Sequence, residues 1–162
     1  MMKLTPLVKG IITAVIMIAT SLIIYFTKAS TNSAVGYLIY ALYAGGILWT
    51  LMEFAKTQED PLTFGRLFNQ GFKCFIVIAL LMVAFTGIMF QLHPEWAEEA
   101  AVLYRADLVK EGNKTPVEID DLVATGKKQF ALSNIAAAIF GYLITGALFT
   151  AVAAGIILLR RK

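Results

Sequence analysis

Four long apolar runs constrain the fold of this chain more than any other feature of its sequence. They cover residues 10–26, 35–54, 72–92 and 135–159. Their charged residues are Glu53, near the end of the second run, and Lys73, near the start of the third. A helix rises about 1.5 Å per residue, so about 20 residues cross the roughly 30 Å hydrocarbon core of a bilayer. The sequence therefore predicts an all-α membrane protein with four transmembrane helices.

The composition of the 162-residue chain agrees with a single integral membrane domain, residues 1–162. Hydrophobic residues make up 59% of the sequence and charged residues 15%, whereas charged residues make up about a quarter of an ordinary soluble domain. The net charge of +3 is not gathered in a basic patch, so we expect the lipid bilayer as a partner and no nucleic acid. The lone cysteine, Cys74, excludes an internal disulfide.

Basic residues beside the runs predict the orientation of the chain. Four spans place both termini on one side, together with Lys3, Lys9, Lys56, Arg66, Lys73, Arg160, Arg161 and Lys162. The opposite side holds Lys28, Arg105, Lys110, Lys114, Lys127 and Lys128, most of them in one long segment. Basic residues are thus denser on the terminal side, and the positive-inside rule predicts cytoplasmic termini. Lys127 and Lys128, close to the fourth run, argue for the opposite orientation.

The stretch EDPLTFGRLFNQGFK, residues 59–73, predicts a helix at the membrane surface that leads into the third span. Asp60 and Pro61 favour a turn, and Thr63 is a suitable cap for a helix that begins at Phe64. Its apolar and polar residues then fall on opposite faces. One interpretation is an anchor for the third span. The other is a docking surface for lipid headgroups or a membrane-protein partner, formed by Phe64, Arg66, Phe68 and Lys73.

Residues 94–133 predict an extracytoplasmic helical hairpin between the third and fourth spans. Pro94 and Gly112 are suited to the start and end of its first helix, and Thr115 to the cap of its second. Gly126 is expected to mark a bend or break before the fourth span begins.

Small residues in the fourth run favour close helix packing. Ala137, Gly141 and Thr145 are spaced by four residues, as are Ala147, Ala151 and Gly155. Such spacing lets two helix backbones approach each other. Packing of Gly141, Ala151 and Gly155 within the chain is our first expectation, and packing against a second copy in a homo-oligomer is the alternative.

Groups that carry out chemistry are scarce in this sequence. We expect no cofactor, no metal site and no catalytic residues, because His93 stands alone and no phosphate-binding loop or nucleophile motif is present. Glu53 is expected to pair with Lys56 or Lys73, and a proton or cation site is the weaker alternative. The sequence therefore favours a non-enzymatic accessory or structural membrane component. A small transporter or channel subunit is the alternative, and a membrane enzyme that uses His93 or Glu95 ranks third.

Three segments together resemble a known family. They are LTFGRLFNQGF before the third span, HPEWAEEA followed by TPVEIDDLV between the third and fourth spans, and the terminal LLRRK. Their order is similar to that in small bacterial membrane proteins grouped as domain of unknown function 4199. The resemblance covers essentially the whole chain. It implies four helices and a multi-pass location in the bacterial inner membrane, and it brings no catalytic residue and no known activity.

Overall fold

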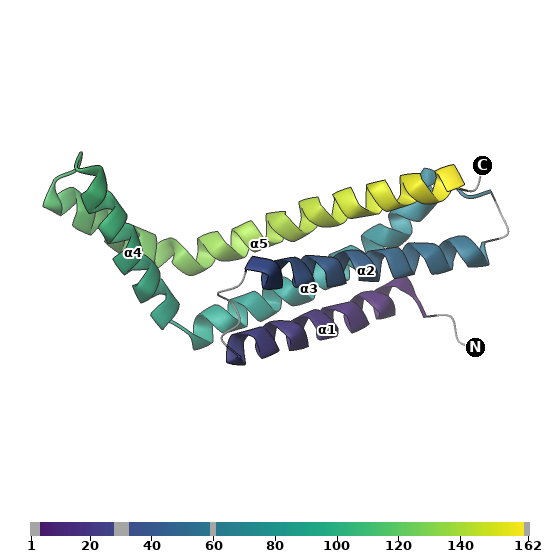
Figure 1. Cartoon of the computed structure of the whole chain (residues 1–162), viewed down its shortest axis with the longest axis horizontal. Coiled ribbons are helices and arrows are strands. Elements are labelled where there is room, and N and C mark those ends of the chain that lie inside the picture. The colour runs from purple at the N-terminus through teal and green to yellow at the C-terminus, as the bar shows by residue number, and fades with distance from the viewer. Residues whose placement is uncertain (1–3, 28–32, 59–60, 161–162) are drawn as a thin grey trace. The chain divides into compact units, whose positions relative to one another are not determined.

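The computed structural model describes residues 4–27, 33–58 and 61–160, and this part of the chain is helical throughout apart from short connections (Figure 1). It contains α1 (Pro6–Phe26), α2 (Ser33–Thr57), α3 (Phe64–Leu92), α4 (Glu95–Glu111) and α5 (Pro116–Arg160). By length and composition, α1, α2, α3 and α5 are able to cross a membrane. The prediction of an all-α chain with four long apolar helices is confirmed. Lys3, Lys28, Asp60, Arg161 and Lys162 lie outside the described residues.

Local side-chain chemistry sets several helix boundaries. The backbone N–H of Arg66 donates to Thr63 Oγ1 at 3.4 Å, which caps α3 at the predicted residue. The end of α4 is Gly112, whose φ of +66° lies in the left-handed region that glycine adopts at little cost. Both predicted boundaries are therefore confirmed.

The expected break at Gly126 is wrong. Helix α5 runs for 45 residues without interruption, so the predicted second outer helix and the fourth span are one element. A single glycine costs a helix interior only about 1 kcal/mol. An added Cβ at Gly126 would lie 3.6 Å from the ring of Tyr104. This glycine therefore leaves room for α4 beside α5 and does not interrupt the helix.

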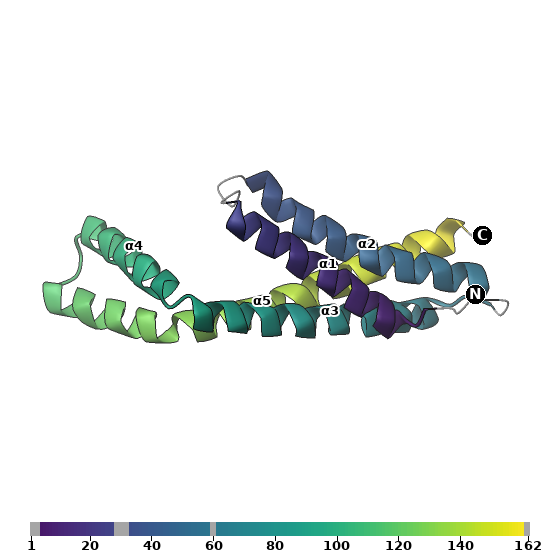
Figure 2. The same ribbon diagram turned by 90° about the horizontal axis from the view of Figure 1, so that it is seen from below.

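The chain divides into two compact units. The first unit holds residues 1–82 and 139–162, and the second holds residues 83–138. In the first unit, α1 and α2 lie side by side (Figure 2). Side chains from four helices have no solvent exposure in its core: Ala14 and Met17 of α1, Tyr43, Ile47 and Leu51 of α2, Leu67, Cys74 and Ile78 of α3, and Ala154 of α5.

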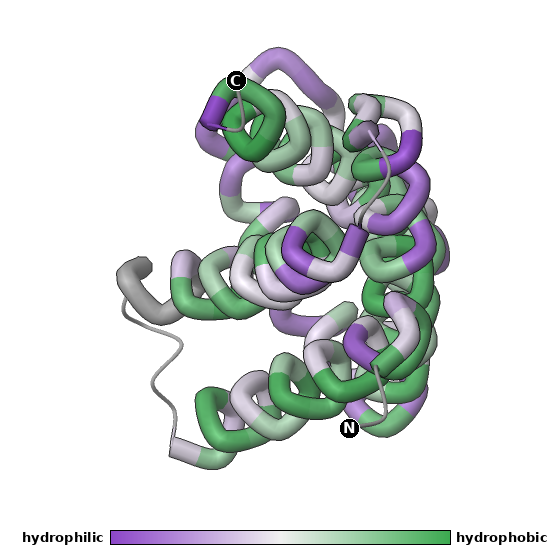
Figure 3. Tube along the Cα trace, turned by 90° about the vertical axis from the view of Figure 1, so that its right-hand side faces the viewer, coloured by the Kyte–Doolittle hydropathy of each residue, from purple (hydrophilic) through white to green (hydrophobic). Residues whose placement is uncertain are grey.

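The outward faces of the first unit are also apolar. Its exposed side chains include Val15 at 57%, Leu80 at 66% and Val152 at 61%. In Figure 3 the hydrophobic colour continues along most of α1 and is not confined to one stripe. A helix that is apolar all round is typical of a large protein core or of a membrane span.

Candidate functional site

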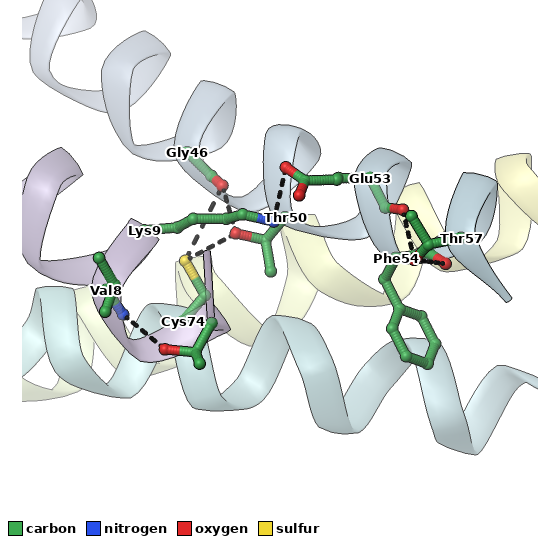
Figure 4. A network of polar contacts seen from close by, with 9 residues as sticks. Val8, Lys9, Gly46, Thr50, Glu53, Phe54, Thr57 and Cys74 are labelled. Atoms are coloured by element: carbon green, nitrogen blue, oxygen red, sulfur yellow. Dashed lines mark hydrogen bonds and ion pairs between the residues drawn. The ribbon is translucent and has the colours of Figure 1, made fainter. Parts of the chain in front are cut away.

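An ion pair joins the start of α1 to the end of α2 in the first unit (Figure 4). Lys9 Nζ lies 2.9 Å from Glu53 Oε2. The Lys9 side chain is 4% exposed and that of Glu53 is 33% exposed. The same ammonium group lies 5.6 Å from the centre of the Trp49 ring, within the range of a cation–π contact. Lys9 is thus nearly sealed from solvent, whereas Glu53 retains partial access.

Burial explains why Lys9 has a counter-charge, because a buried charge is costly unless it is paired. Lys9 lies just past the first turn of α1, and Glu53 lies just before the last turn of α2. Because the two helices are antiparallel here, each charge neutralises the other.

Close helix approach buries Lys9. An added Cβ at Gly46 of α2 would overlap the side chain of Thr13 in α1. An added Cβ at Gly10 would lie 2.7 Å from the carbonyl oxygen of Cys74 in α3. Two glycines therefore allow α1 to pack tightly against both α2 and α3. The hydroxyl of Thr13 donates to the Lys9 carbonyl oxygen at 2.8 Å, so this polar group is satisfied within α1.

A second polar cluster lies beside the ion pair and contains Thr50, Cys74 and the Gly46 carbonyl (Figure 4). The Thr50 hydroxyl donates to the Gly46 oxygen at 2.9 Å and lies 3.3 Å from Cys74 Sγ. The Cys74 thiol donates to the same Gly46 oxygen at 3.8 Å. Thr50 and Cys74 are buried, and their hydrogen bonds join them to each other and to the Gly46 carbonyl. This cluster links α2 to α3 and offers no activated nucleophile.

The second unit is held together by charge and aromatic contacts. Arg105 and Lys127 form ion pairs with Asp120 and Glu98, respectively, and both pairs join α4 to α5. The Phe90 ring lies 5.8 Å from Trp96 and 5.5 Å from Phe130. At the start of α5, Thr115 and Glu118 form a capping box, in which the Thr115 N–H donates to Glu118 Oε2 at 2.7 Å. This hydrogen bond lowers the pKa of the Glu118 carboxyl below its usual range.

The lone histidine lies in the second unit. His93 Nδ1 is 2.6 Å from Glu95 Oε1, and the imidazole stacks on the Trp96 ring at 4.7 Å between centroids. The hydrogen bond from His93 lowers the pKa of the Glu95 carboxyl. A depressed carboxyl pKa opposes a role as general acid at neutral pH. Within the described residues, no group of three or more His, Cys, Asp or Glu side chains is placed to hold a metal ion.

Comparison with protein families identifies the chain. The model of the family described as "Protein of unknown function (DUF4199)" matches residues 9–158. The chain belongs to the DUF4199 family. Comparisons with curated proteins and with solved structures found no match.

The predicted interfacial residues of this DUF4199 chain lie on the first turns of α3. Phe64, Arg66 and Lys73 are exposed, Phe68 is half-buried, and the two aromatic rings stack at 5.9 Å. The buried face of the same turns contains Leu67 at 0% exposure. One face of these turns is therefore buried, and the exposed face carries aromatic as well as basic side chains.

The small residues of α5 pack differently from the first expectation. Gly141 and Gly155 have no neighbour within 4 Å of an added Cβ, and Ala151 is half-buried. The close approach is made by Gly146, where an added Cβ would overlap the Tyr43 hydroxyl. Packing of Gly141, Ala151 and Gly155 thus remains a prediction that concerns a second copy.

The cation beside Glu53 is the main site residue that the sequence analysis missed. Lys56 and Lys73 were the predicted partners of Glu53, and the structure places Lys9 there. The sequence held a signal for Lys9, because it directly precedes the first uncharged run at Gly10. A cation at that position is equally typical of a simple orientation signal.

Proposed function

We propose that this DUF4199 chain is an integral membrane protein with four spans, α1, α2, α3 and the second half of α5. We further propose that it serves as a non-enzymatic accessory or structural component of the bacterial inner membrane. The observation that carries the proposal is the apolar outer surface of the first unit. Ile11, Val15, Leu80, Leu148 and Val152 are each at least 47% exposed, and large apolar surfaces are rarely exposed on soluble monomers.

The distribution of charge supports the same arrangement. In the described part of the first unit, Glu53 is the acidic residue, and Lys9 neutralises it. Of the other cations, Lys56, Arg66 and Arg160 lie near helix ends, and Lys73 lies within the first third of α3. Such an arrangement suits a bilayer with these helix ends on the cytoplasmic side, in line with the positive-inside rule. We therefore place the termini in the cytoplasm and the second unit outside it.

An accessory role is favoured by the way the polar groups are used. The ion pair, the Thr50 cluster and the Tyr43 hydroxyl each join one helix to another. Tyr43 donates to the Tyr142 carbonyl oxygen at 2.9 Å and so links α2 to α5. Polar groups used in this way stabilise the helix packing. The surface that remains for contact with a partner is therefore the exposed faces of the helices. The exposed face of α3 with Phe64, Arg66, Phe68 and Lys73 is the proposed contact.

The test is purification in a mild detergent with identification of the proteins that accompany the chain. We expect a specific partner with the native sequence and with the control K110Q/K128Q, and loss of that partner with R66E/K73E. The control removes two cations from the second unit and leaves α3 unchanged. Recovery of the same partner with R66E/K73E would refute the α3 contact. Release of the chain from membranes by alkaline carbonate would refute the membrane proposal itself.

A small transporter or channel subunit is the second candidate, and the Lys9–Glu53 pair favours it. Buried ionisable groups within spans often mark ion pathways, and Glu53 keeps partial access to solvent. Flux assays in proteoliposomes distinguish the two functions. Transport that is lost with E53Q, while far-UV circular dichroism shows the variant to be folded, and retained with E118Q would support the transporter. Equal flux in both variants would exclude Glu53 as its ion site.

A further inference from the structure

A groove runs between α2 and α5 at the end of the first unit where both helices terminate. Its volume is about 310 Å³. Ala55 and Ala153 are 6% and 4% exposed and form its floor. The residues that complete the lining are Leu48, Met52, Lys56, Ile156, Ile157 and Arg160. The lining is thus mostly apolar, with Lys56 and Arg160 as its charged members.

Both cations of the groove lie at one end of it. Lys56 is in the last turn of α2 and Arg160 is in the last turn of α5. Both side chains are exposed, and in the described part of the chain neither forms an ion pair. From Leu48 to Lys56 the wall of the groove extends about 12 Å along α2, at 1.5 Å per residue. The groove therefore combines an apolar trough with two cations at one end, neither of which is paired with an acidic side chain among the described residues.

We propose that this groove binds an anionic phospholipid, with one acyl chain along the trough and the phosphate at Lys56 and Arg160. Basic pockets between transmembrane helices on the cytoplasmic side are suited to acidic headgroups. The guanidinium of Arg160 is able to donate two parallel hydrogen bonds to phosphate oxygens, and the ammonium of Lys56 supplies a second charge. The apolar trough alone would accept any lipid, so the two cations provide the selectivity.

A second copy of the chain fits this groove less well than a lipid. A symmetric contact through the groove would place Lys56 and Arg160 of both copies together, and like charges repel. Glu53 is the acidic residue in the described part of the first unit, and it is already paired with Lys9. The charge of the groove is therefore complementary to a headgroup phosphate and not to the described first unit of another copy.

The test uses the full chain reconstituted in vesicles of equal parts phosphatidylglycerol and phosphatidylcholine, then transferred to mild detergent for native mass spectrometry. We expect phosphatidylglycerol to be retained in preference to phosphatidylcholine. Each cation near a membrane surface contributes about fivefold, the equivalent of about 1 kcal/mol. The K56Q/R160Q variant should therefore lower the ratio of the two retained lipids about 25-fold. The charge-matched control K110Q/K128Q should leave the ratio unchanged.

A second pair of variants tests the trough without altering charge. Met52 and Ile156 are 49% and 48% exposed, so M52W/I156W should fill the groove while the fold is kept. Leu148 and Val152 are exposed on α5 outside the groove, and L148W/V152W is the matched control. We expect retained phosphatidylglycerol to fall at least fivefold in the first variant only. Far-UV circular dichroism of each variant confirms that the helices are intact.

Several results would overturn the proposal. They are an unchanged lipid ratio in K56Q/R160Q, full retention in M52W/I156W, or a lipid-free dimer cross-linked through the groove. The proposal rests on membrane insertion, which alkaline extraction tests separately. A chain that resists extraction but shows no lipid preference would refute the groove site alone, whereas a chain that is extracted would refute both.

Discussion

The Lys9–Glu53 ion pair should show strong coupling in a double-mutant cycle. In E53Q, the Lys9 side chain, which is 4% exposed in the native chain, loses its counter-charge. Removal of one partner of a buried pair costs about 3–5 kcal/mol. Glu53 is itself 33% exposed, so solvent screens part of the interaction. We therefore expect the free energy of unfolding to fall by about 3 kcal/mol, the lower end of that range.

The other two corners of the cycle should cost less. In K9M, an apolar side chain of similar length fills the site of Lys9, and Glu53 is able to turn toward solvent. This change should cost about 1 kcal/mol, the upper end for an ion pair whose remaining partner is solvated. In the double variant K9M/E53Q no charge is left without a partner, so its unfolding free energy should also lie within about 1 kcal/mol of the native value. The coupling free energy is then about 3–5 kcal/mol.

The assay is equilibrium unfolding in mixed micelles with increasing dodecyl sulfate, followed by far-UV circular dichroism. All four proteins are compared at one pH and one salt concentration. Additive effects, with the double variant at least as unstable as E53Q, would show that the pair does not hold α1 against α2. A loss in E53Q of less than about 0.5 kcal/mol, within the range of ordinary surface substitutions, would contradict the burial of Lys9.

Two further predictions concern α5. G146A should lower the free energy of unfolding by about 1–3 kcal/mol, because the new methyl group meets Tyr43 and lies 2.7 Å from the Phe75 ring; G141A, which meets no neighbour within 4 Å, should be neutral or slightly stabilising in the same micelle assay. Equal losses in the two variants would contradict the packing of α5 against Tyr43 and Phe75. The start of α5 should open in acid, because the pKa of Glu118 is lower in the folded chain than in the unfolded one. The carboxylate therefore stabilises the capping box fully at pH values above the unfolded pKa of about 4.3, and this stabilisation is lost as the pH falls through the folded pKa. The amide hydrogens of Thr115 and Glu118 should therefore become more protected against exchange as the pH rises from about 3 to about 6, an interval set around the value of about 4.3. In E118Q, their protection should not change over the same interval. Protection that does not change with pH in the native chain would contradict the capping role of Glu118.

The sequence was sufficient to predict the elements and several of their ends. Apolar runs long enough to form spans are visible without tertiary information, and Thr63 and Gly112 act through neighbours only a few residues away. Gly126 was misjudged because a glycine that interrupts a helix and one that makes room for a neighbouring ring look the same in sequence. The Tyr104 contact decides between them.

The candidate site was less accessible to sequence reasoning, for a physical reason. Helices α1 and α2 and the second half of α5 are mostly apolar, so the pattern does not reveal which face meets another helix. Glu53 was recognised, but its partner lies 44 positions earlier and is set by the packing of α1 against α2. The same uncertainty applies to the choice between Gly146 and Gly141, since both are small residues in one apolar run.

Cysteine accessibility tests the four-span account most directly. In a C74A background, N113C and T57C are compared using a membrane-impermeant maleimide, because Asn113 and Thr57 are both exposed and lie on either side of α3. The account predicts that N113C reacts in cells with a permeabilised outer membrane, and that T57C reacts only after the inner membrane is opened. Labelling of both positions from the same side would contradict it.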